Sequence, residues 1–121
     1  MNLTPTEAGE QIALFEWAAH AAGKHPELAL MYAIPNGGSR HKAEAANLKR
    51  QGVKSGVPDI CLPVARGASH GLYIELKRQK GGRLSPEQTD WLVALGEQGY
   101  KAVVANGFDE ARRTIERYLE G

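Results

Sequence analysis

Apolar residues recur every three or four positions in the first part of the chain, which is the spacing of one face of an α-helix. The pattern begins at Thr4 or Thr6 and ends near Gly23, with Pro26 shortly beyond it. We predict one helix over this segment, and Pro5 is tolerated near its first turn. Its inward-facing residues are expected to be Ile12, Phe15, Ala19 and Ala22, with Leu14, Trp17, Ala18 and Ala21 widening the apolar face.

Two segments of different polarity follow this helix. The apolar run 28–35 (LALMYAIP) is too short for periodicity to separate a strand from a helix extension, so its structure stays open. The cluster 36–39 (NGGS) is typical of a turn. A basic helix is predicted from about residue 41 to residue 51, and Gly52 ends it.

Two runs of β-favouring residues, 60–64 and 72–77, are separated by 65–71. They predict a β-hairpin. Pro63 cannot donate a hydrogen bond within a sheet, so the first strand is expected to be short or to lie at a sheet edge.

A helix with a strong start signal follows the hairpin. Ser85 and Gln88 form a capping box, Pro86 occupies the first helical position, and Gly99 ends the helix. The next strand, 101–105, is joined to 72–77 by this helix, and a strand–helix–strand crossover makes two strands parallel with a right-handed connection.

Asp109 is predicted to cap a final helix whose inward residues are Ala111, Ile115 and Leu119. The expected order is α-α-β-β-α-β-α, with a possible extra strand after the first helix. This order describes an α/β fold in which a mixed sheet is flanked by helices.

Composition limits the class of protein. A chain of 121 residues fits a single domain, 1–121, with one core. No apolar run approaches the roughly 20 residues that span a bilayer, and the N-terminus lacks a signal pattern, so we expect no membrane association and a cytoplasmic location. The one cysteine, Cys61, has no second cysteine for a disulfide or a zinc site, and we interpret it as a buried thiol.

The charge is divided unevenly although the whole chain carries only +1. Between residues 36 and 83 there are ten Lys or Arg and three acids, a net +7, and the remainder carries −6. Such a basic segment suits a polyanionic backbone, although solvated surface charge explains it equally well without further observations.

Three charged residues near the hairpin carry the candidate chemistry. Side chains alternate along a strand, so Glu75 and Lys77 share one face. Asp59 precedes the neighbouring strand, and strand pairing can bring its carboxylate close to that of Glu75. Two carboxylates form an oxygen-rich site for Mg²⁺ or Mn²⁺, to which the backbone carbonyl of Leu76 is a plausible further ligand. Such a site with a lysine beside it suits hydrolysis of a phosphodiester.

These residues resemble the PD-(D/E)XK nuclease motif, and more narrowly the chain resembles the VRR-NUC family. That family includes stand-alone phage and bacterial nucleases and the nuclease domain of a DNA-repair enzyme. The resemblance covers nearly the whole chain and implies a restriction-endonuclease-like core. Its segments are 34–38 (IPNGG), 48–53 (LKRQGV), 56–59 (GVPD), 71–77 (GLYIELK), 85–88 (SPEQ) and 99–100 (GY).

The resemblance implies that Asp59 and Glu75 bind the metal ion and that Lys77 is the catalytic lysine. It also implies an acidic metal ligand on the first helix. We prefer Glu7 for this role, with Glu10 as its rival, although a solvated glutamate in the first turn is a sufficient alternative. Gln88 recurs in such nucleases and is therefore a further candidate catalytic residue, although its capping box is a sufficient structural explanation.

A further group of polar and basic residues is expected to contact DNA phosphates. A plain surface turn explains the members in 36–42 equally well. The group comprises Asn36, Gly37, Ser39, Arg40, Lys42, Lys49, Arg50 and Lys54.

The leading hypothesis is a Mg²⁺- or Mn²⁺-dependent DNA endonuclease. Because stand-alone members of the resembled family act on branched DNA, the resemblance suggests four-way (Holliday) junctions as substrate and a homodimer that supplies two active sites. The alternative is a catalytically silent or partner-dependent nucleic-acid-binding module, against which the intact triad speaks. A purely structural protein would leave the clustered basic residues unexplained.

Overall fold

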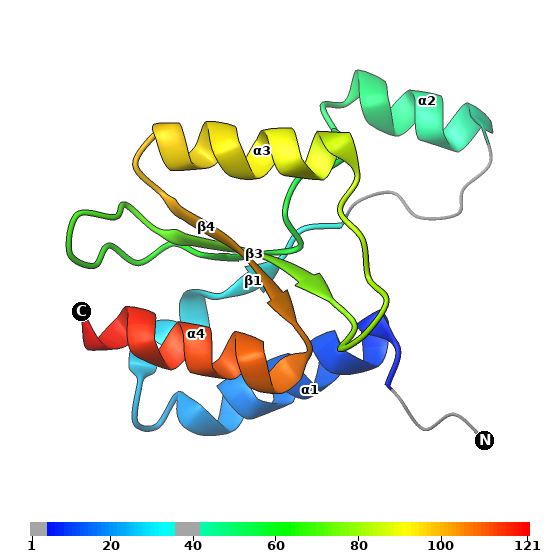
Figure 1. The fold of residues 1–121 in the computed structure, drawn as a ribbon. Coiled ribbons are helices and arrows are strands. Elements are labelled where there is room, and N and C mark those ends of the chain that lie inside the picture. The colour runs from blue at the N-terminus through cyan, green and yellow to red at the C-terminus, as the bar shows by residue number, and fades with distance from the viewer. Residues whose placement is uncertain (1–4, 36–41) are drawn as a thin grey trace.

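The computed structural model describes residues 5–35 and 42–121. Within these ranges the chain forms a sheet with helices on both faces (Figure 1). In chain order the elements are α1 (Glu7–Ala21), the 3-10 helix η1 (Pro26–Leu30), β1 (Tyr32–Ala33), α2 (Lys42–Arg50), β2 (Ile60–Leu62), β3 (Leu72–Lys77), α3 (Pro86–Glu97), β4 (Lys101–Asn106) and α4 (Phe108–Glu120).

The sheet is mixed, with the strand order β1-β2-β3-β4. Strands β1, β2 and β3 pair antiparallel, and β4 joins β3 in parallel, with Leu72 opposite Lys101 and Lys77 opposite Asn106. The hairpin, the parallel pair and the α/β class are therefore confirmed. Strand β2 is short, as Pro63 predicts, but it lies inside the sheet, because the open segment 28–35 supplies β1 as its second neighbour.

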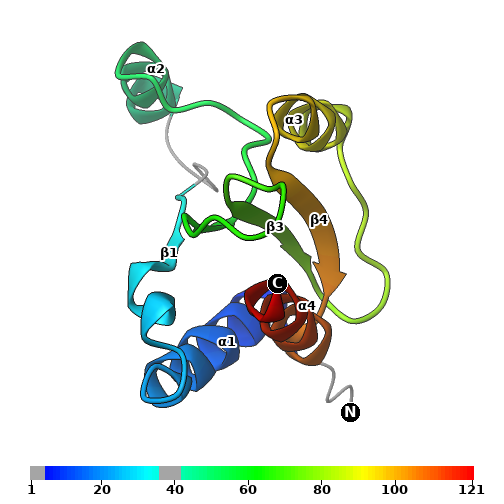
Figure 2. The same cartoon turned by 90° about the vertical axis from the view of Figure 1, so that its left-hand side faces the viewer.

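Helices α1 and α4 cover one face of the sheet and α3 covers the other (Figure 2). The core lies under α1 and α4, where β3 contributes Leu72, Ile74 and Leu76 and α4 contributes Ile115. Each buried aliphatic side chain stabilises the fold by about 1.5–3 kcal/mol. This packing fixes which face of β3 meets the core and which faces α3.

The predicted apolar face of α1 is confirmed in part, since Phe15, Trp17, Ala21 and Ala22 pack against the core. Leu14 and Ala18 are buried together with Glu10, whereas Ile12 is 60% exposed and Ala19 is exposed as well. Because apolar residues occupy most sides of α1, the sequence did not define the narrow stripe that meets the sheet and α4.

Helix α4 begins one residue before Asp109, so the prediction that Asp109 caps it is wrong. Gly107, with φ of +93°, is the N-cap residue, and Asp109 lies in the first turn. There it pairs with Arg112 and Arg113, which hold the pKa of its carboxyl below the ordinary value. Ala111, Ile115 and Leu119 are buried as predicted.

Helix α2 projects from the rest of the structure in both views (Figures 1 and 2). None of its residues is buried. Among the described residues, no helix combines the length and the apolar character that crossing a membrane requires.

Candidate metal and phosphate site

Asp59 is held at the start of β2 by backbone hydrogen bonds on both sides. Its carbonyl accepts a hydrogen bond from Ile34 N at 2.7 Å, and its Oδ2 accepts one from Leu76 N at 2.8 Å. The second contact aims the carboxylate at β3. Asp59 therefore meets the strand that carries Glu75 and Lys77, as strand pairing predicts.

Gly56 fixes the approach of this segment to α3. Its φ is +87°, and a Cβ atom there would lie 2.7 Å from the backbone of Glu87. One turn of helix further along, Trp91 Nε1 donates a hydrogen bond to Ser55 O at 3.1 Å. A residue with a side chain at position 56 would separate the two segments.

Glu75 and Lys77 project from β3 toward α3, while Ile74 and Leu76 enter the core. Both charged residues are nearly inaccessible, with Glu75 1% and Lys77 8% exposed. Lys77 Nζ lies 3.7 Å from Glu75 Oε2. These two residues therefore do not owe their charge to a solvent-exposed face of the strand.

Gln88 connects this pair with the start of α3. Its Oε1 accepts hydrogen bonds from Ser85 N at 2.8 Å and from Lys77 Nζ at 3.2 Å, and its Nε2 donates to Glu75 Oε2 at 3.2 Å. The predicted capping box is present. The same side chain thus caps α3 and orients two charged groups of the site.

The two candidate acids on α1 lie in different surroundings. Carboxylate oxygens of Glu7, Asp59 and Glu75 lie within 4.8 Å of one another. Glu10 is buried instead beside α4, where its Oε1 accepts a hydrogen bond from Phe108 N at 3.0 Å. Only Glu7 is in the cluster, because Glu10 satisfies the backbone at the start of another helix.

Burial dominates the electrostatics of Glu75. It is the largest cause that raises the pKa of this carboxyl from 4.5 to about 8, followed by hydrogen bonding to Asp59 and the charge of Asp59, while Lys77 opposes the rise. Glu75 Oε1 receives no hydrogen bond from any donor in the described residues. The carboxyl therefore holds a proton at neutral pH unless another positive charge replaces it.

A divalent cation fits this cluster. Three carboxylates supply hard oxygen ligands, which Mg²⁺ and Mn²⁺ prefer, and the buried oxygen of Glu75 without a donor is an acceptor that such an ion would satisfy. The amide of Leu76 is occupied by Asp59, and its side chain is fully buried, so any ligand from this residue would be its carbonyl.

The residues predicted to bind DNA are described only in part. Lys42, Lys49 and Arg50 are exposed on α2, and Lys54 is exposed just after it. Lys54 borders an apolar hollow of about 630 Å³ that Trp91 also lines. Asn36, Gly37, Gly38, Ser39, Arg40 and His41 lie outside the described residues.

A second group of basic residues, separate from those predicted to bind DNA, lies beside the cluster. A pocket of about 700 Å³ is bordered by Glu7 and Lys77 and also by Arg78, Lys80 and Arg83. These three residues belong to the basic segment 36–83, but only the folding of the β3–α3 loop places them beside Glu7.

Two comparisons with known proteins identify the family of this chain. The VRR-NUC domain matches residues 8–109. A solved structure described as a VRR_NUC domain protein superposes with a TM-score of 0.84 at 35% sequence identity, covering 96% of this chain and 89% of that one. None of the curated proteins compared with this sequence matches it. The VRR-NUC domain match includes Asp59 and Glu75 and begins one residue after Glu7. Both comparisons span the nuclease-type fold, and the chain belongs to the VRR-NUC family.

Proposed function

We propose that this protein is a metal-dependent DNA endonuclease that hydrolyses phosphodiester bonds at the cluster of Glu7, Asp59 and Glu75. The observation that carries the proposal is the convergence of these three carboxylates within 4.8 Å, with the Lys77 ammonium 3.7 Å from Glu75. Acids and a lysine this close together match the needs of phosphoryl chemistry.

The carboxylates would hold the cation. Mg²⁺ or Mn²⁺ bound there would neutralise charge on the phosphate oxygens and lower the pKa of a neighbouring water molecule. Glu7 comes from α1, Asp59 directly precedes β2 and Glu75 lies on β3, so docking of α1 on β3 completes the set. The carbonyl of Leu76 is our candidate for a further oxygen ligand.

Lys77 would stabilise the negative charge that develops on the phosphate and orient the attacking water. Gln88 fixes the Lys77 ammonium through its Oε1 and holds Glu75 through its Nε2. Because Gln88 is also tied to the backbone of Ser85, the position of this ammonium is linked to the start of α3. We assign Gln88 a positioning role on this ground.

For the substrate we propose branched DNA such as a four-way junction, and for the assembly a homodimer. The substrate rests on the VRR-NUC family to which the chain belongs, since stand-alone members of that family act on branched DNA. The homodimer rests on the substrate, because symmetrical cleavage of a junction requires two active sites. Light scattering after gel filtration tests the dimer, since a mass near twice the 13.1 kDa of the chain is expected.

The central test incubates pure protein with labelled junction, flap, single-stranded and duplex DNA in Mg²⁺, Mn²⁺ or EDTA. Cleavage is expected with either metal and none with EDTA. We expect Lys77→Ala to slow cleavage by at least about a hundredfold and leave DNA binding largely intact. The control is Lys101→Ala, which removes the same charge from an exposed position at the start of β4.

Three outcomes would contradict the proposal. Cleavage that persists in EDTA excludes a metal-dependent reaction, and full activity of Lys77→Ala removes that residue from the mechanism. Tight DNA binding without cleavage in any metal would favour the silent binding module instead.

Charge reversal at Lys49 and Arg50 tests the predicted role of α2, since it should weaken DNA binding and flatten the salt dependence of that binding.

A further inference from the structure

The loop between β3 and α3, residues 78–84, carries cations without acidic partners. Within the described ranges, Lys80 and Arg83 make no hydrogen bond or ion pair, and Arg78 donates only to the carbonyl of Gly81 at 3.2 Å. All seven residues of the loop are exposed. Unpaired cations gathered on one short loop favour an anion from outside the chain.

Close packing holds this loop against the site. A Cβ atom at Gly82 would lie 2.9 Å from Lys77 Cβ, and one at Gly107 would lie 2.7 Å from Gln79 Cγ. Gly81 adopts φ of +79°, the left-handed region that glycine enters at little cost. The loop therefore lies directly on the strand end that carries Lys77.

The resulting pocket combines the loop with part of the metal site. Its wall includes Arg78, Lys80 and Arg83 on one side and Glu7 with the start of α1 on the other, around a volume of about 700 Å³. An anion in this pocket would lie next to the carboxylates, where a positive wall offsets their repulsion of a phosphate. The pocket thus suits the phosphates that flank a reacting phosphodiester.

We propose that residues 78–83 form a phosphate clamp, in which Lys80 and Arg83 hold the nucleic-acid backbone beside the carboxylate cluster. The clamp rests on the proposed nuclease function and adds to it a binding surface distinct from α2. Its contacts go to phosphates, so it contributes affinity without reading the base sequence.

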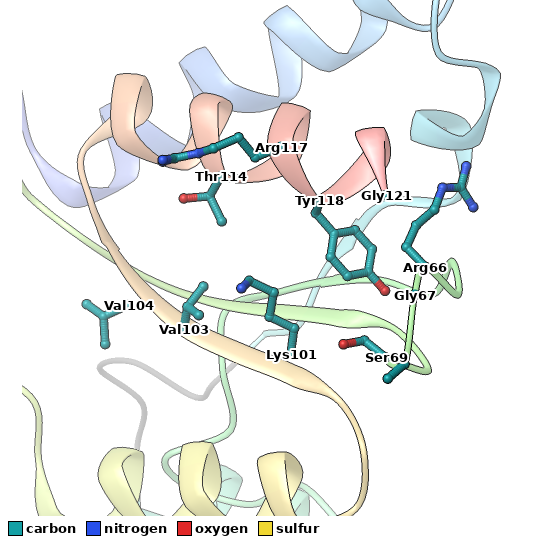
Figure 3. A pocket seen from close by; sticks show the side chains of 11 residues that line it. Arg66, Gly67, Ser69, Lys101, Val103, Val104, Thr114, Arg117, Tyr118 and Gly121 are labelled. Carbon is teal, nitrogen blue, oxygen red and sulfur yellow. The ribbon is translucent and has the colours of Figure 1, made fainter.

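A second basic hollow provides the matched control. Lys101 and Arg117 line a pocket of about 570 Å³ between β4 and α4 (Figure 3). Lys101 lies at the start of β4, five residues before Asn106, the partner of Lys77 in the sheet, and thus about 17 Å away along the strand. No residue of the carboxylate cluster borders this hollow.

The experiment measures binding of labelled duplex DNA by fluorescence anisotropy in EDTA, across a series of KCl concentrations. We expect the double variant Lys80→Ala/Arg83→Ala to bind at least about tenfold more weakly and to lower the slope of log K against log salt by about 1 to 2. Lys101→Ala/Arg117→Ala removes equal charge and should change both quantities much less. Lys80→Arg/Arg83→Lys keeps the charge and should bind like wild type.

Equal affinity and slope in the wild type and the clamp variant would overturn the clamp, and so would equal losses in the clamp and control variants. Single Lys80→Gln and Arg83→Gln variants replace the double variant if it unfolds. Cleavage in Mn²⁺ is measured separately, so a protein that binds through the clamp but never cuts would refute the nuclease function alone. A protein that cuts but binds equally well without the two cations would refute the clamp alone.

Discussion

Replacing Glu75 with glutamine tests how the proton on the buried carboxyl makes the stability of the folded chain depend on pH. Folded Glu75 keeps this proton up to about pH 8, whereas the carboxyl of the unfolded chain loses it near 4.5. Between these values the folded state binds more protons than the unfolded state, so the free energy of unfolding falls as pH rises. In EDTA, wild-type stability should decline from about pH 5 to pH 8.

The size of this decline follows from the two pKa values. A rise from 4.5 to about 8 corresponds to an upper limit of about 5 kcal/mol, because each pH unit is worth about 1.4 kcal/mol. Relaxation of the folded protein and entry of water reduce the penalty of burying this charge, so we expect about 2–4 kcal/mol. For a chain of this length that is on the order of 10 °C in melting temperature.

The assay is thermal or urea unfolding in EDTA at half-unit steps of pH. Glu75→Gln has no carboxyl to titrate at this position and should lose most of the slope, whereas Glu16→Gln, exposed on α1, should keep it. Adding Mn²⁺ at pH 8 should restore wild-type stability by binding only the folded state, and it should do little for Glu75→Gln. Parallel curves for wild type and Glu75→Gln in EDTA would refute the reasoning.

Four further substitutions test the site and its supports. Glu10→Ala removes the buried acceptor at the start of α4 and should lower the free energy of unfolding in urea by about 1–3 kcal/mol. Glu7→Ala lies at the exposed end of α1 and should change this free energy by less than about 0.5 kcal/mol. The same variant should bind Mn²⁺ more weakly when binding is measured by calorimetry. Gly56→Ala combines a positive φ with a 2.7 Å contact to α3, so we expect a loss of at least about 2 kcal/mol together with weaker Mn²⁺ binding; unchanged values would contradict the role of this glycine. Tyr118→Phe removes a buried hydrogen bond of 2.5 Å to a backbone carbonyl and should cost about 1–2 kcal/mol without altering Mn²⁺ affinity.

Local patterns were sufficient wherever a few neighbouring residues decide the conformation. The capping box at Ser85 and the alternation along 72–77 need no distant partner, and both are present as predicted. The apolar segment 28–35 was different, since it became partly 3-10 helix and partly strand only because β2 offers a free edge to pair with. The start of α4 was misjudged because Gly107, not a polar side chain, occupies its N-cap.

The choice between Glu7 and Glu10 shows the limit most clearly. Both are acids in the first turn of α1, and their spacing alone makes either a candidate. Packing of α1 against β3 and α4 decides between them, because it turns Glu10 toward the backbone of Phe108 and leaves Glu7 beside Asp59. A rotation of the helix by one residue, about 100°, would have changed this outcome.

The sequence by itself determined the types and order of the main elements, the charged pair on β3 and the family to which the chain belongs. These depend on periodicity, capping and motif spacing, which are properties of short segments. Only the tertiary structure decided how deeply Glu75 is buried, which acid of α1 joins it, and that the loop 78–84 faces the same pocket. Burial and convergence arise from contacts between segments far apart in the chain, and no local pattern records them.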